Sequence, residues 1–136
     1  MGGETNAPNR VNIVLSNYST TLRTEQEELV EEYFPLPTAI FGQGDFFILR
    51  ASGDSMIEAG IESGDLVVIQ RNQVAEEGDI VAALIENRES TLKTLRYDRP
   101  NRCTILHPEN KALDDIRTTD CQIQGVAVNV IKSLRR

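Results

Sequence analysis

Residues 46–71 read FFILRASGDSMIEAGIESGDLVVIQR, and this stretch decides the fold class. It opens and closes with apolar runs, at 46–50 and 66–71, that have the length and the β-branched and aromatic content of strands. Between the two runs lie glycine, serine and aspartate residues, which favour turns. The stretch therefore predicts two strands joined by a long turn, which is typical of a β protein.

Strand-like runs continue towards the C-terminus. They lie at residues 79–86, 90–97, 103–106 and 122–132, and clusters of Gly, Asn, Asp and Pro separate them. With the two runs of the central stretch they make six short strands from residue 46 onward. This spacing favours a curled sheet or a partial barrel.

The N-terminal residues carry a different pattern. Residues 1–10 are rich in Gly, Asn, Pro and charge and predict a flexible lead-in, because such a composition buries little apolar surface. Residues 11–15 form a short strand-like run. Thr24 and Glu27 have the spacing of a capping box and predict a short helix that ends before Pro35. The apolar stripe of this helix would consist of Leu29, Val30 and Tyr33.

Length and composition fit one small domain. The chain has 136 residues, 40% of them hydrophobic, which is enough for one packed core. Its net charge of −7 repels phosphate backbones, so a basic nucleic-acid binder is excluded. Cys103 and Cys121 have neither zinc-site nor disulfide-framework spacing, which predicts a cytoplasmic location and no metal. The apolar runs are too short to span a membrane.

Ser55 is a candidate nucleophile because it lies on the turn that follows a strand. A serine hydroxyl needs a neighbouring base, and the chain offers His107 or one of three lysines, Lys93, Lys111 and Lys132. His107 precedes a proline in a turn-like segment and is expected to be a loop residue. Lys93 lies in a strand-like run, where alternation does not say which way it points. Spacing alone favours an ordinary turn and a surface lysine.

Several segments resemble the LexA and UmuD family of self-cleaving serine peptidases, and they occur in the family's order. RASGDSMI at 50–57 and GIESGDL at 60–66 resemble the nucleophile motif, and TLKTL at 91–95 resembles the lysine strand. GDIVAA at 78–83, LHPEN at 106–110 and QGVAV at 124–128 complete the match. The resemblance covers about residues 31–136. It implies a mainly β fold, a small curled sheet or partial barrel of the LexA C-terminal domain type, with at most one short N-terminal helix.

The resemblance also implies site residues and a domain organisation. Ser55 would be the nucleophile, Lys93 the general base, and the backbone N–H groups of Asp54 and Ser55 the oxyanion hole. Residues 31–136 would form the peptidase and dimerisation domain. Residues 1–30 would be a flexible lead-in that holds the cleavage-site region near Ser19, Thr20 and Thr21. The family usually cuts at Ala-Gly or Cys-Gly, and neither pair occurs at residues 17–21.

The implied function is intramolecular cleavage of the N-terminal segment of an SOS-response transcriptional repressor, stimulated by a RecA filament. DNA would be contacted only through a helix-turn-helix domain that this chain does not contain. A homodimer is expected because residues 122–131 carry apolar side chains on both strand faces. Two alternatives are a UmuD-like accessory subunit of a translesion DNA polymerase and a dimerisation domain that has lost cleavage. Neither a metal nor an organic cofactor is implied.

Overall fold

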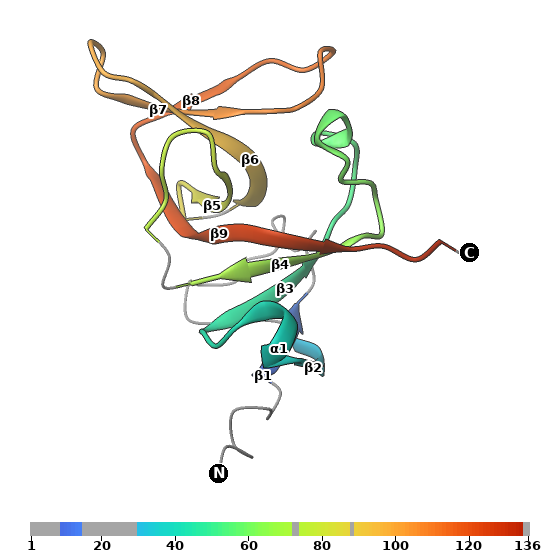
Figure 1. Ribbon diagram of the computed structural model, residues 1–136. Helices are drawn as coiled ribbons and strands as arrows, with labels where there is room; N and C mark the ends of the chain where they lie inside the picture. The colour runs from blue at the N-terminus through green and yellow to red at the C-terminus, as the bar shows by residue number, and fades with distance from the viewer. Residues whose placement is uncertain (1–8, 15–29, 72–73, 88, 135–136) are drawn as a thin grey trace.

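The computed structural model describes residues 9–14, 30–71, 74–87 and 89–134. Within them the chain forms nine strands, one four-residue α-helix and one short 3-10 helix (Figure 1). In chain order these are β1 (Asn9–Val14), β2 (Val30–Leu36), α1 (Thr38–Phe41), β3 (Phe46–Arg50), η3 (Ile57–Ala59), β4 (Leu66–Gln70), β5 (Ile80–Ile85), β6 (Glu89–Asp98), β7 (Cys103–His107), β8 (Ile116–Thr118) and β9 (Cys121–Ile131).

All nine strands belong to one sheet, in the order β2-β1-β3-β4-β9-β5-β6-β7-β8. Neighbouring strands are antiparallel except for β1 and β3, which are parallel. The long strand β9 pairs with β4 along its second half and with β5 along its first half, so it joins the two parts of the sheet. Figure 1 shows β9 crossing the molecule between the β3–β4 region and the strongly curved β5–β6 region.

Strand β3 is buried on both faces, which explains its unbroken apolar sequence. Phe47 and Leu49 pack in one hydrophobic cluster, while Phe46 and Ile48 pack in another on the opposite face. This division follows the two-residue repeat of strand side chains. A strand that serves two cores needs apolar residues at every position.

The first hydrophobic cluster extends across several strands and anchors the turn after β3. It contains Phe47 and Leu49 of β3, Val67 and Ile69 of β4, and Ala82 of β5. The cluster also contains three residues of the loop between β3 and β4, namely Ala51, Met56 and Ile61. The turn that carries Ser55 is therefore fixed to the core on both sides of the serine.

The expected fold class is confirmed, and one predicted element is wrong. The structure is mainly β in a curled sheet, with the short helix α1 as its α-helix within the described residues. Residues 30–33 of the predicted helix lie in β2, where Tyr33 pairs with Asn12 of β1. Pairing with a neighbouring strand outweighs the weak helical pattern there. The predicted lead-in ends inside β1, which begins at Asn9.

Candidate active site

The loop between β3 and β4 presents Ser55 on a short turn. Its base is closed by two backbone hydrogen bonds: Ala51 N–H donates to the Asp65 carbonyl at 2.7 Å, and Gly64 N–H donates to the Ala51 carbonyl at 2.8 Å. Gly53 has a φ of +80°, a left-handed conformation that glycine adopts without strain. The chain can therefore reverse direction immediately before Asp54 and Ser55.

Lys93 points inward from β6 and reaches Ser55. Its side-chain amine lies 3.2 Å from Ser55 Oγ and 2.5 Å from Thr91 Oγ1. Only 8% of Lys93 is exposed, so this amine is largely removed from water. The structure thus brings together two residues that stand 38 positions apart in the sequence. Thr91 was not among the predicted site residues, although it lies two positions from Lys93 on the same face of the strand.

The backbone N–H groups of Asp54 and Ser55 are available beside the serine hydroxyl. Within the described part of the chain, neither donates a hydrogen bond to another residue. The Asp54 carbonyl, in contrast, accepts bonds from Ile57 N–H at 3.2 Å and from Asn110 Nδ2 at 2.9 Å. A hydroxyl, a buried amine and two free N–H donors are the groups that acyl transfer requires.

Comparison with known proteins identifies the family of the chain. A family model described as Peptidase S24-like matches residues 13–128. The chain belongs to the peptidase S24-like family. The LexA repressor of Halalkalibacterium halodurans is 43% identical over 107 residues, which cover 79% of this chain and 51% of that protein. The LexA repressors of Mycobacterium tuberculosis and Mycobacterium marinum are 44% and 45% identical over 108 residues. The chain spans about half the length of these curated relatives.

A second loop, the bracing loop (residues 109–111), holds the turn that carries Ser55. It follows β7, and its residues 109–111 make four contacts with the turn. Glu58 N–H donates to the Glu109 carbonyl at 2.8 Å, and Glu109 N–H lies 3.4 Å from Met56 Sδ. Lys111 N–H donates to Glu58 Oε2 at 2.9 Å, and Asn110 Nδ2 donates to the Asp54 carbonyl. In the sequence this loop stands out only as part of the LHPEN motif at 106–110, from which no role was predicted.

Two of the other candidate bases, His107 and Lys132, are paired with acidic residues away from Ser55. His107 Nδ1 lies 2.6 Å from Asp115 Oδ1, on the side of β7 that leads into the bracing loop. Lys132 forms a hydrogen bond and ion pair with the buried carboxylate of Asp65, which raises the pKa of the lysine amine. Of the bases considered from the sequence, Lys93 is the one that contacts Ser55 within the described residues.

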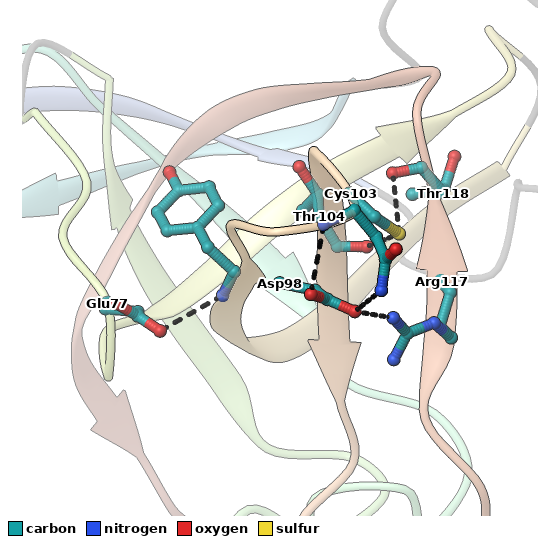
Figure 2. Close-up of polar contacts among 8 residues, drawn as sticks. Glu77, Asp98, Cys103, Thr104, Arg117 and Thr118 are labelled. Carbon is teal, nitrogen blue, oxygen red and sulfur yellow. Dashed lines mark hydrogen bonds and ion pairs between the residues drawn. The ribbon is translucent and has the colours of Figure 1, made fainter.

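A separate pocket of about 360 Å³ lies at the β6–β7 hairpin. Its lining residues are Tyr97, Asp98, Arg99, Arg102, Cys103 and Thr104. Figure 2 shows the polar contacts around it, where Asp98 accepts hydrogen bonds from Asn101 and Arg117 that hold the pKa of its carboxyl below the usual 3.8. None of the site residues predicted from the sequence lines this pocket.

The expected cleavage-site region at Ser19, Thr20 and Thr21 lies outside the described residues. Among the residues that the structure does describe, no group of three or more His, Cys, Asp or Glu side chains could hold a metal ion. Cys103 and Cys121 are both free thiols. No helix in the described ranges is long and apolar enough to cross a membrane.

Proposed function

We propose that this chain is a Ser–Lys peptidase domain that cuts a peptide bond in its own N-terminal segment. The observation that carries the proposal is the 3.2 Å approach of the Lys93 amine to the Ser55 hydroxyl. This separation is within the reach of a general base for the proton it removes. Burial supports the role, because an amine that is removed from water loses part of the stabilisation of its charged form.

In the proposed reaction, neutral Lys93 accepts the hydroxyl proton as Ser55 Oγ attacks the carbonyl carbon. The negative charge that develops on the carbonyl oxygen is stabilised by the N–H groups of Asp54 and Ser55. The C–N bond then breaks, Lys93 returns the proton to the departing amine, and an ester to Ser55 remains. Water hydrolyses this ester with Lys93 again acting as the base, which restores the serine.

We propose residues 1–30 as the segment that is cut, near Ser19, Thr20 and Thr21, and residues 31–136 as the peptidase domain. An intramolecular reaction suits a modest catalytic pair, because a tethered peptide has a high effective concentration at the nucleophile. The relatives are named LexA repressors. By analogy, the chain would serve a cytoplasmic repressor of the SOS response, with RecA promoting cleavage and DNA bound through a further domain.

Homodimerisation through β9 is part of this proposal. Val128 and Val130 are 40% and 38% exposed, although both lie in a strand near the centre of the sheet. A second copy of the chain would cover these side chains. A bacterial repressor commonly binds its operator as a dimer, since the two halves of an operator mirror the symmetry of the protein.

A second candidate function is dimerisation without cleavage. It is favoured by one observation, the absence of Ala-Gly and Cys-Gly at residues 17–21. A UmuD-like accessory subunit, in which the same fold contacts a translesion DNA polymerase, is a further alternative. Both predict that the purified chain stays intact.

The deciding experiment follows the mass of the purified chain from neutral pH to about pH 10, where an ordinary lysine loses its proton. We expect cleavage within residues 16–22 that becomes faster with pH, and no cleavage in Ser55→Ala or Lys93→Ala. Ser63→Ala is the matched control, because this side chain is exposed. A chain that stays uncut at every pH would favour the dimerisation domain, and a peptide with an Ala-Gly site would then be supplied in trans.

A further inference from the structure

We propose that Asn110 is a positioning residue for the oxyanion hole, an inference that rests on the proposed peptidase function. Its side-chain NH₂ group donates to the Asp54 carbonyl at 2.9 Å, from a loop 56 residues away in the sequence. The peptide unit that contains this carbonyl also contains the Ser55 N–H. Asn110 thus holds the carbonyl of this peptide unit, and the N–H of the same unit would stabilise the developing oxyanion.

The rigidity of the peptide unit makes this contact effective. The bond between Asp54 and Ser55 is trans, since no cis peptide occurs in the described residues. In a planar trans peptide the C=O and N–H bonds point in opposite directions. Fixing the Asp54 carbonyl therefore fixes the direction of the Ser55 N–H, and a rotation of the unit would break the bond to Asn110.

Asn110 is itself held so that its donor faces Asp54. Its side-chain Oδ1 accepts a hydrogen bond from Ala112 N–H at 2.9 Å, and its backbone carbonyl accepts one from Leu113 N–H at 3.0 Å. Because an N–H group occupies the oxygen end of the amide, the NH₂ end must point towards Asp54. The assignment of the amide orientation thus follows from its partners.

The remaining bond to the Asp54 carbonyl cannot replace Asn110. That bond comes from Ile57 N–H at 3.2 Å, which lies within the same turn and moves with it. Asn110 belongs to the bracing loop, which is also tied to Glu58 and, through Glu109 Oε2 at 2.7 Å, to Thr94 of β6. Thr94 is next to Lys93 in the sequence. The bracing loop therefore connects the turn that carries Ser55 to the strand that carries Lys93.

Asn110→Asp tests the proposal, because an aspartate has the same shape but places an oxygen against the Asp54 carbonyl. We expect the highest rate of self-cleavage to fall about ten- to a hundredfold, less than the hundred- to thousandfold loss of an oxyanion donor. The midpoint of the pH–rate profile should stay where it is, since Lys93 sets it. Asn87→Asp is the matched control: Asn87 is exposed in the β5–β6 turn.

A second measurement does not depend on cleavage. In a Lys93→Ala background, the amide of Ser55 is followed by NMR, and Asn110→Asp and Asn110→Ala should both shift its resonance and lower its order parameter. Asn87→Asp should leave it unchanged. If the wild-type chain is never cut, the NMR result still tests Asn110, and the peptidase proposal fails separately. Unchanged Ser55 resonances, or an Asn110→Asp chain that cleaves at the wild-type maximum, would overturn the inference.

Discussion

The amine of Lys93 is a polar group that is largely buried in the sheet. It contacts two hydroxyl oxygens, Ser55 Oγ and Thr91 Oγ1, and Leu95, two residues further along β6, is fully buried. A buried polar group without partners costs about 1–3 kcal/mol. Thr91 therefore has two effects on Lys93: it satisfies the amine, and it sets the direction from which the amine approaches Ser55.

Thr91→Val keeps the shape of the side chain and removes the oxygen that accepts from Lys93. We expect self-cleavage to become about tenfold slower, because the amine loses part of its orientation. The midpoint of the pH–rate profile should move to lower pH, since the ammonium form loses an acceptor that favours it. The measurement is the rate of cleavage between pH 6 and 11, with the exposed Thr119→Val as control. A midpoint that moves upward would contradict this role.

Ser55 and Lys93 could both be selected as catalytic candidates from the sequence, but the contact between them could not be predicted. Ser55 follows a strand and could be selected from the turn pattern, whereas Lys93 has leucines on both strand faces nearby and its direction was open. The resemblance to known peptidases selected Lys93, and the fold explains it, because curling of the sheet carries β6 over the turn after β3. Asn110 and Thr91 were not predicted, because their contacts depend on the fold and leave no pattern in the sequence.

Strand β9 approaches β4 closely at Gly125. A Cβ atom built on Gly125 would lie 2.6 Å from Ile69 Cγ2 and 2.7 Å from the backbone oxygen of Gln70. Gly125 pairs with Ala82 of β5, and both ladders of β9 shift register close to this residue. A glycine here lets the strand pass from one half of the sheet to the other.

Gly125→Ala should destabilise the fold by about 3 kcal/mol, near the upper end for overpacked sites, because one of the clashing atoms is backbone. Urea unfolding gives the difference in midpoint, and an unchanged slope would show that the denatured state is the same. Asn129→Ala, an exposed position on the same strand, should change stability by less than about 0.5 kcal/mol. A fully stable Gly125→Ala chain would mean that β4 and β9 can move apart freely.

The elements predicted best from the sequence are the buried strands, because burial requires apolar residues there. The strands from β3 to β7 and β9 were predicted because apolar runs and turn residues alternate. The strand β8 escaped prediction, since Ile116–Thr118 has only three residues and no apolar run. At β2 the spacing of Val30 and Tyr33 suggested a helix, yet the partner strand β1 selects the extended form. Local spacing cannot reveal such a partner.

The C-terminal half of β9 exposes apolar side chains to solvent. Val126 is 6% exposed, whereas Val128 and Val130, further along the same strand, are 40% and 38% exposed. Leu134 beyond the strand is 97% exposed. Single exposed apolar residues are common on proteins, but consecutive alternate positions on a central strand are the pattern that a partner subunit would cover.

Val130→Asp tests the homodimer, because a charge at a partly exposed position is tolerated in the monomer but is costly in a buried interface. We expect the wild-type chain to sediment as a dimer at tens of micromolar and Val130→Asp as a monomer with an unchanged circular dichroism spectrum. We expect the dissociation constant of the Val130→Asp dimer to be about a hundredfold higher than that of the wild type, which corresponds to about 2.8 kcal/mol. Val74→Asp is the matched control, since Val74 is 80% exposed in the β4–β5 loop and lies outside the proposed interface. A wild-type chain that sediments as a monomer would remove the homodimer, while a dimeric Val130→Asp chain would move the interface to another face.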